Sequence, residues 1–172
     1  MLILLAGLIL AAETARGIDL TVDDARGVCS VHGEFVVQAS PDTAWAVLSD
    51  YDNIPRFVHS MVSSKAEYLA DGRIVVRQQA VGHMFLFSRR VNVQLEVREQ
   101  PGQWIEFRDV LGKDFTHYVG DWEIAPDSSG TRVIYRLEAS PRVAMPSGMR
   151  CGLLKHAARD LLDEVRAEIL RR

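Results

Sequence analysis

Between Met61 and Ser140 the apolar residues recur at every second position, and turn sequences interrupt the pattern at short intervals. This period is typical of strands that bury one face. The breaks are ADG, VGH, QPGQ, LGKD and PDSSG, which favour tight turns. Connections this short cannot carry a parallel crossover, so consecutive strands must pair antiparallel. The pattern predicts six strands, at Met61–Leu69, Arg73–Val81, Met84–Glu99, Gln103–Val110, Thr116–Ile124 and Thr131–Ser140.

Further elements are predicted on both sides of this region. Ile18–Asp23 and Val28–Ala39 resemble the strands of a hairpin. Ser40 before Pro41 is typical of a helix start, and Pro55 is best tolerated in the first turn of a second, short helix. Residues 147–172 predict a long helix with one apolar stripe, formed by Leu153, Leu154, Ala157, Ala158, Leu161, Leu162, Val165 and Ile169.

The one long helix is too narrow to cover the dry face of the sheet. A helix is about 10 Å across, whereas about seven strands make a sheet roughly 34 Å wide. The sheet must therefore curl around the helix, and the segment SDYDNIPRFVHSM at residues 49–61 must close the open end. The interior is then either filled by side chains or left as an apolar cavity, and the small Ala157 and Ala158 favour a gap.

The order of elements resembles the helix-grip fold of the START/SRPBCC superfamily. The segment PDTAWAVLSDYDNIPRFVHSMVSSK is similar to the polyketide cyclase/dehydrase and coenzyme Q-binding START-like group, as are the later segments FSRRVNV, VGDWEI and GTRVIYRLEASP. The resemblance covers about residues 28–170. It implies an α+β fold in which a curved antiparallel sheet of about seven strands wraps a C-terminal helix, with two small helices after the first core strand. It also implies that residues 49–61 shape a pocket entrance, with Tyr51 and Phe57 turned inward.

The expected function is non-catalytic binding or transport of a hydrophobic small molecule, such as a lipid, an isoprenoid or quinone, or a polyketide-like compound. Transient membrane contact would serve ligand exchange. The candidate ligand-binding residues share an inward strand phase, a place on the helix stripe or a place near the entrance: Trp45, Tyr51, Phe57, Met61, Phe85, Phe87, Arg89, Tyr118, Trp122, Tyr135, Met149, Leu153, Leu154, Ala157, Ala158 and Leu161. Taken singly, each apolar member also fits ordinary core packing.

Arg89 is the one charged candidate. Alternation places it on the dry face, where an unpaired charge is costly, and there it would anchor a polar head group. Alternatively, irregular pairing turns it to solvent. An enzymatic alternative, a cyclase or dehydratase, would use Arg89, Tyr118 or Asp109 if all three lined one cavity. A second alternative is a protein-interaction module with a filled groove.

Charge and motifs exclude several other functions. The chain of 172 residues has a net charge of −3 and no basic cluster typical of nucleic-acid binding. Its five histidines are scattered without metal-ligand spacing, and no glycine pattern for a phosphate or dinucleotide is present. We expect no catalytic residue, no metal and no cofactor.

The N-terminal residues 1–17 predict a signal peptide or hydrophobic leader ahead of a single domain at 18–172. The run MLILLAGLILAA is followed by a small-x-small site at Ala15–Gly17, although no basic residue precedes it. We expect export to the periplasm or outside the cell, or a cytoplasmic location if the run is not a signal. In an oxidising compartment Cys29 and Cys151 could pair, and two free thiols are the alternative.

Overall fold

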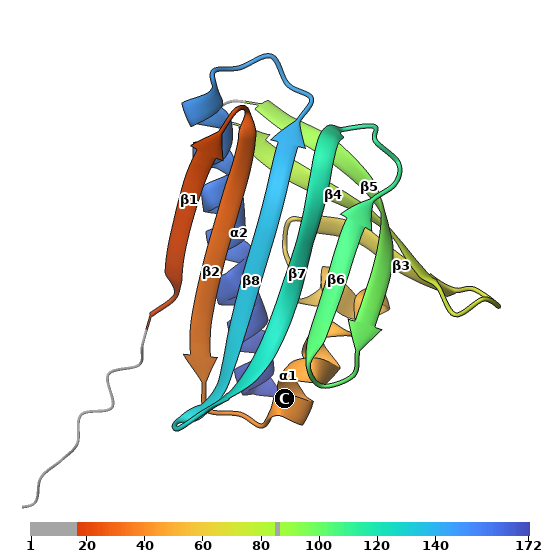
Figure 1. Ribbon diagram of the computed structural model, residues 1–172, viewed down its shortest axis with the longest axis vertical. Helices are drawn as coiled ribbons and strands as arrows, with labels where there is room; N and C mark the ends of the chain where they lie inside the picture. Colours follow the sequence, from red (N-terminus) through yellow and green to blue (C-terminus); the bar gives the residue numbers. More distant parts are fainter. Residues whose placement is uncertain (1–16, 85–86) are drawn as a thin grey trace, which may run out of the picture.

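The computed structural model describes residues 17–84 and 87–172, which form one eight-stranded antiparallel sheet and a long C-terminal helix (Figure 1). The sheet order is β1-β2-β8-β7-β6-β5-β4-β3. Its elements are β1 (Asp19–Ala25), β2 (Val28–Val37), α1 (Pro41–Leu48), η1 (Tyr51–Arg56), β3 (Met61–Tyr68), β4 (Ile74–Met84), β5 (Phe87–Gln100), β6 (Trp104–Asp109), β7 (Phe115–Asp127), β8 (Gly130–Pro141) and α2 (Ser147–Arg171).

The predicted helix-grip architecture is confirmed, with eight strands instead of about seven. The strand predicted at Ile18–Asp23 is β1, which pairs with β2 along its whole length, from Asp19 opposite Glu34 to Ala25 opposite Val28. Strands β3 to β8 form the predicted meander. The predicted leader lies outside the described residues except for Gly17. No helix in the described part of the chain has both the length and the apolarity required to cross a membrane.

A long-range pairing joins the beginning of the chain to its end. β2 pairs with β8, with Cys29 opposite Ala139 and Val37 opposite Thr131. Along β8 every second residue is buried, from Thr131 to Ala139, which is the alternation expected of a strand with one dry face. This pairing places the first strands of the chain beside the strand that leads into α2.

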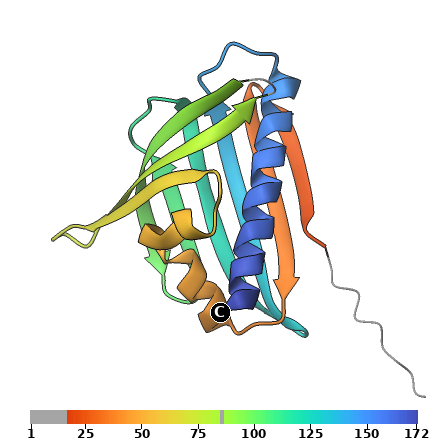
Figure 2. The ribbon, with the colours of Figure 1, turned by 180° about the vertical axis from the view of Figure 1, so that it is seen from behind.

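α2 lies over one side of the concave face, against β1 and β2 (Figure 2). Leu162 and Ile169 are fully buried there. Gly33 of β2 allows this close approach, because a Cβ at that position would lie 2.4 Å from Cδ1 of Leu162. The helix consequently leaves the inner face of β4 to β6 uncovered, and other elements must close it.

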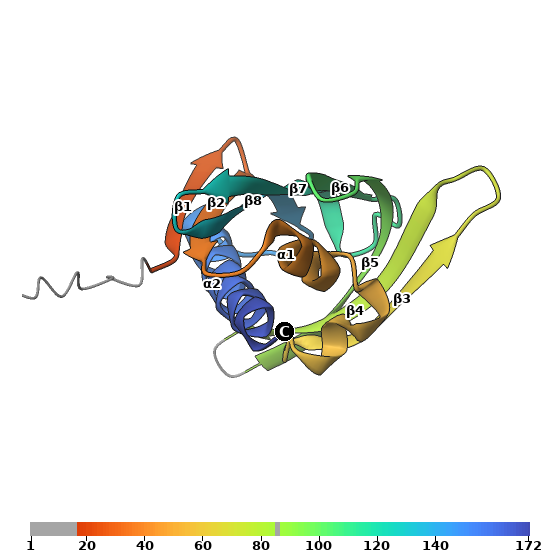
Figure 3. The same cartoon turned by 90° about the horizontal axis from the view of Figure 1, so that it is seen from below.

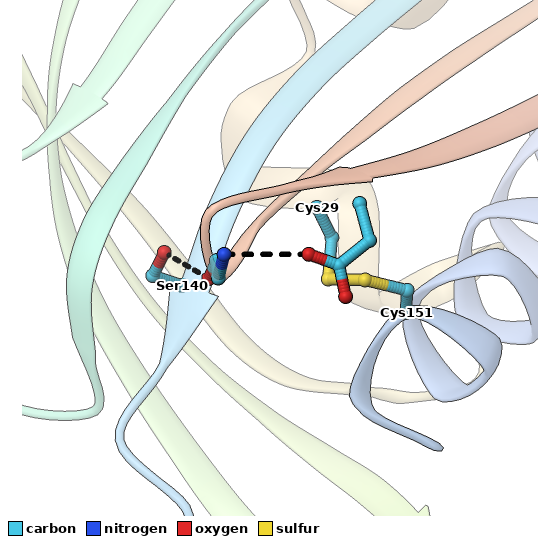
Figure 4. Close-up of a disulfide and its surroundings, with 5 residues drawn as sticks. Cys29, Ser140 and Cys151 are labelled. Carbon is cyan, nitrogen blue, oxygen red and sulfur yellow. Dashed lines mark hydrogen bonds between the residues drawn. A yellow bond between two sulfur atoms is a disulfide. The ribbon is translucent and has the colours of Figure 1, made fainter. Parts of the chain in front are cut away.

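A disulfide fixes the N-terminal part of α2 to the sheet. Cys29 of β2 and Cys151 of α2 are bonded, with Cα atoms 5.4 Å apart, and both residues are buried (Figure 4). Close by, the Ser140 hydroxyl donates to the carbonyl oxygen of Gly27 at 2.8 Å. Of the two states that the sequence allowed for these cysteines, the structure has the paired one.

Candidate functional site

An apolar cavity of about 120 Å³ lies between the concave face of the sheet, the second half of α2 and the α1–η1 segment. Viewed from the end in Figure 3, α1 sits in the opening of the curved sheet, between α2 and the β3–β4 strands. The helical and rim side of the lining consists of Val47, Leu48, Tyr51, Ile54, Phe57, Val58, Met61, Leu161 and Val165. The sheet side consists of Val76, Gln78, Leu95, Val97, Ile105, Phe107, Tyr118, Trp122 and Tyr135.

α1 forms one end of the cavity because local sequence fixes where it begins. The Ser40 hydroxyl accepts a hydrogen bond from the Thr43 backbone N–H at 3.1 Å, and Pro41 occupies the first turn. These are favourable N-terminal residues for a helix. The eight-residue helix buries Val47 and Leu48, which both face the cavity.

Residues 49–61, called the rim segment below, continue from α1 to β3 with the 3₁₀ helix η1 in their middle. Asp50 accepts hydrogen bonds from Asn53 at 2.7 Å and from Arg172 at 2.8 Å. Asp52 accepts one from the backbone N–H of Ala66 at 2.7 Å. The polar residues of the segment therefore hold its outer side, while apolar neighbours turn inward.

The rim segment is also tied to α2. The His59 backbone N–H donates to Oε2 of Glu164 at 3.2 Å, and the His59 ring contacts Oε1 of the same carboxylate. The Arg172 guanidinium donates to Asp50 and to the carbonyl oxygen of Ala46 at 3.1 Å. Together these polar contacts hold the rim segment and α1 against the second half of α2, beside the cavity.

Tyr51 is buried in the cavity wall, and its hydroxyl donates to Oε2 of Glu99 at 2.6 Å. Burial, reinforced by the Glu99 carboxylate, raises the pKa of Tyr51 far above its ordinary value. The hydroxyl therefore stays protonated at neutral pH, and it donates its proton in the hydrogen bond to Glu99.

The wall on β6 to β8 is a cluster of aromatic rings. The Tyr135 ring lies 4.5 Å from the Trp122 ring and 6.4 Å from the Phe107 ring, between centroids. Phe107 also lies 6.0 Å from Tyr118. Burial raises the pKa of Tyr118 to about 12, and burial together with the neighbouring Tyr118 raises that of Tyr135. Both hydroxyls thus stay neutral at physiological pH.

Seven of the sixteen candidate ligand-binding residues line the cavity, namely Tyr51, Phe57, Met61, Tyr118, Trp122, Tyr135 and Leu161. The others on α2 lie elsewhere. Leu154 and Ala158 pack against the core without lining the cavity, and Leu153 is half-buried and does not line it. Ala157, predicted on the inward stripe, and Met149, predicted near the entrance, are exposed and do not line it. The reason is the position of α2, whose first half packs against β1 and β2, so that Leu161 and Val165 carry the helical lining.

Three further candidates are Trp45, which does not line the cavity, and Phe85 and Phe87, which the structure does not test. Trp45 packs against the core but does not line the cavity. Phe85 lies outside the described residues, and the prediction for the Phe87 side chain stays untested.

Arg89 also lies away from the cavity, so its expected role as a buried head-group anchor needs correction. Its pairing is regular, opposite Gly82, but the side chain is 46% exposed and donates to Oδ1 of Asp114 at 3.0 Å. Asp114 is buried, and although burial alone raises its pKa, hydrogen bonds from Asn92 and Arg89 lower it below the ordinary value. Arg89 shares the strand phase of the buried Val93 and Leu95, but it lies near the start of β5, where its side chain is exposed and does not line the cavity.

Eleven residues of the cavity lining were not predicted from the sequence, and for two of them the strand alternation could have indicated an inward side chain. Phe107 and Gln78 both occupy the inward phase of their strands, beside buried Ile105 and Val76. Gln78 donates to the Ser64 hydroxyl at 3.2 Å and is the only amide in the lining. The remaining nine are aliphatic, and aliphatic residues that line a cavity have the same alternation as those that fill a core.

The cavity chemistry is apolar and uncharged. No Lys, Arg, His, Asp or Glu is among its lining residues. Asp109 instead accepts hydrogen bonds from the backbone of Gln94, Leu111 and Gly112, at 2.9 to 3.0 Å, and holds the turn after β6. Across residues 17–84 and 87–172 no three His, Cys, Asp or Glu side chains gather in a way that could hold a metal ion.

Solved structures share this fold at low sequence identity. The Zhui aromatase/cyclase from Streptomyces sp. R1128 is 17% identical, with a TM-score of 0.72 over 84% of this chain and 95% of that one. A START superfamily protein from Mycobacterium smegmatis is 18% identical, with a TM-score of 0.70 over 84% and 97%. A STAR-related lipid transfer protein from Xanthomonas axonopodis is 19% identical, with a TM-score of 0.64 over 91% and 100%.

Comparison at the level of sequence gives the family. No curated protein matches the chain. The family profile for polyketide cyclase / dehydrase and lipid transport matches residues 28–170, which is most of the chain and includes every residue that lines the cavity. Sequence and fold agree, and the chain belongs to the polyketide cyclase/dehydrase and lipid transport family of the START/SRPBCC superfamily.

Proposed function

We propose that the protein binds and carries a hydrophobic small molecule in this cavity without transforming it. The supporting observation is the lining, which combines apolar side chains with a few neutral polar groups and contains no charged side chain. Such a site gains binding free energy from burial of apolar ligand surface, at about 25 cal/mol per Å², and uses isolated polar groups for orientation. An open cavity also favours a ligand-binding role over an interaction module with a filled groove.

The family description includes cyclases and dehydrases, so catalysis is the alternative. General acid–base catalysis needs a group whose pKa lies near the working pH. The lining offers only tyrosines whose pKa values are raised, and neither Arg89 nor Asp109 reaches it. These observations favour a carrier.

The cavity, at about 120 Å³, is small for a whole lipid. It is similar in size to an engineered apolar cavity of about 150 Å³ that holds one benzene, whereas ligand pockets usually measure about 300–1,000 Å³. A larger ligand therefore requires outward movement of the rim segment, against its contacts with Glu164 and Arg172. Because such a ligand is poorly soluble in water, we expect exchange to occur during transient membrane contact.

Native mass spectrometry of protein purified without detergent tests the proposal. We expect an additional mass from a co-purifying apolar compound, recovered chemically unchanged after incubation. Leu161→Trp places an indole in the cavity and should abolish this mass. Leu170→Trp is the matched control, because Leu170 lies on the same helix but is 55% exposed and does not line the cavity. Equal loading of the two folded variants would contradict the proposal.

We also propose that the protein is exported, to the periplasm or outside the cell. The apolar N-terminal run and its small-x-small site support this location, and a buried disulfide is typical of oxidising compartments. Expression of the full chain followed by thiol alkylation and mass spectrometry should give a protein without its first 17 residues and without free thiols. An uncleaved protein with two alkylated cysteines would contradict export.

A further inference from the structure

Four segments that are far apart in the sequence meet at the end of the sheet opposite α1 (Figure 1). Hydrogen bonds connect several of them. The Arg142 backbone N–H donates to the carbonyl oxygen of Asp114 at 2.8 Å, and its Nε donates to that of Gly112 at 3.1 Å. The Ser140 hydroxyl bonds to Gly27 in the β1–β2 turn. We call this surface the loop end, and it comprises residues 24–27, 88–90, 110–114 and 142–150.

The loop end carries positive charges that no carboxylate neutralises. Along the strands, Arg108 and Arg136 form ion pairs at 2.6 to 2.7 Å. The loop end contains six basic residues but only two acidic ones, Asp24 and Asp114, and Arg89 pairs with Asp114 at 3.0 Å. Among the described residues, the other five loop-end cations form no ion pair, namely Arg26, Arg90, Lys113, Arg142 and Arg150.

Two of these cations occupy positions that are unfavourable for an arginine. Arg26 has a φ of 56°, in the left-handed region that non-glycine residues rarely adopt, and with Gly27 it forms the two-residue turn between β1 and β2. Asn followed by Gly is the preferred sequence for such a turn. Arg150 is half-buried, and its Nε is buried without a hydrogen-bond partner among the described residues, which is also costly. Folding alone therefore does not explain an arginine at either position.

Exposed aliphatic side chains lie among the cations. Val110 is 47% exposed and Leu111 is 46% exposed, just before Lys113 in the β6–β7 loop. Met149, next to Arg150, is 45% exposed. Apolar side chains interspersed with cations are typical of surfaces that lie on anionic membranes, because the apolar groups enter the interface while the cations are attracted to the head groups.

We propose that the loop end docks on the surface of an anionic lipid bilayer, with Val110, Leu111 and Met149 inserted between the head groups and the five unpaired cations against the lipid phosphates. This inference goes beyond the proposed function, because docking does not require an occupied cavity. The rim segment is not part of the loop end, so it stays free to move outward in the docked protein.

Vesicle flotation tests the proposal on the protein recovered after expression of the full chain. We expect binding to vesicles of phosphatidylcholine and phosphatidylglycerol in a ratio of about 7:3, weaker binding to phosphatidylcholine alone, and loss of the difference at high salt. Arg90→Ala/Lys113→Ala should weaken binding to the anionic vesicles about 10- to 30-fold. Arg73→Ala/Arg98→Ala is the matched control, because it removes the same charge from exposed side chains outside the loop end, and it should change binding less than about 2-fold.

Two further variants separate docking from folding and from charge alone. Arg26→Asn places a residue suited to the left-handed region in the turn, so it should keep or raise the free energy of unfolding while it weakens vesicle binding about 3- to 5-fold. Val110→Ser/Leu111→Ser keeps every charge and should weaken binding several-fold. Wild-type vesicle binding by this second variant would show that no apolar side chain enters a bilayer, and that the loop end instead suits an acidic macromolecule.

The site of contact is measured separately by NMR with bicelles of the same lipids that contain a gadolinium-labelled lipid. The backbone amide signals of Leu111 and Gly112 should broaden first, and those of Ile18 and Gly72, outside the loop end, should not. Broadening strongest at Ile18 would assign the membrane contact to the N-terminal run and overturn the proposal, as would equal binding to neutral and anionic vesicles. Neither result changes the mass of a co-purifying compound, so docking and the proposed function fail separately.

Discussion

Tyr51 shows how single residues combine two tasks at this site. Its ring forms part of the cavity wall, while its hydroxyl bonds to Glu99, which lies 48 residues further along the chain on β5. The hydrogen bond thus fixes the start of the rim segment to the sheet. A buried hydroxyl bonded to a carboxylate is among the stronger polar contacts in proteins.

Tyr51→Phe should lower the free energy of unfolding by about 1–2 kcal/mol, because the ring stays and the charge-assisted hydrogen bond is lost. Urea denaturation measures the change. Tyr68→Phe is the control, since the Tyr68 side chain is 69% exposed, and it should change stability by less than about 0.5 kcal/mol. Equal stabilities of the two variants would show that the Glu99 contact contributes nothing.

At the scale of elements, α2 is held at both ends and spans the cavity between them. The disulfide fixes it at Cys151, and its last turn is held by Glu168, which is 6% exposed and accepts from Arg171 and Arg172 at 2.7 Å. Arg172 in turn reaches Asp50 on the rim segment. The polar contacts at this end thus join α2, α1 and the rim segment into one closed wall.

Hydrogen bonds from Arg171 lower the pKa of Glu168 to about 2, and those from Arg172 add to the effect. The folded-state pKa lies below the unfolded value, so the unfolded state binds more protons between about pH 4.5 and pH 2. The stabilisation from Glu168 is therefore complete above about pH 5 and is lost as the pH falls toward 2.

Urea denaturation of wild type and Glu168→Gln should show this dependence. The variant should be less stable at pH 7, and the difference should shrink steadily as the pH falls from 5 to 2. Asp163→Asn changes an exposed carboxylate on the same helix and should give a small difference at every pH. A stability gap for Glu168→Gln that did not vary with pH would contradict the role of its charge.

The position of α2 also marks the limit of what the sequence predicts. Alternation along the strands gives the inward faces, including those of Tyr118, Trp122 and Tyr135, and the apolar stripe gives the buried face of the helix. The place of the helix relative to the strands depends on contacts between residues far apart in the sequence, such as the close approach of Leu162 to Gly33. Of the helix residues predicted to bind the ligand, Leu161 lines the cavity, together with Val165, whereas those at 149–158 lie too close to the N-terminus of α2.

At the scale of the whole molecule, one covalent link joins the first strands to the last helix. Cys29 and Cys151 are separated by 122 residues, and the loop between them contains every residue of the cavity lining except Leu161 and Val165. Both cysteines are buried on the β2 side of α2, and neither lines the cavity. The disulfide should therefore act mainly on the unfolded chain and leave the site unchanged.

Replacement of both cysteines, in Cys29→Ala/Cys151→Ala, should lower the free energy of unfolding by about 3–5 kcal/mol, since a loop of this length loses much conformational entropy when it is closed. Urea denaturation of the variant against the oxidised wild type measures the loss. At temperatures where the variant is folded, native mass spectrometry should show the same additional mass from a co-purifying apolar compound as in the wild type. A variant that folds with wild-type stability would show that the cross-link does not constrain the unfolded chain. A folded variant without this additional mass would show that the cross-link also positions α2 over the cavity.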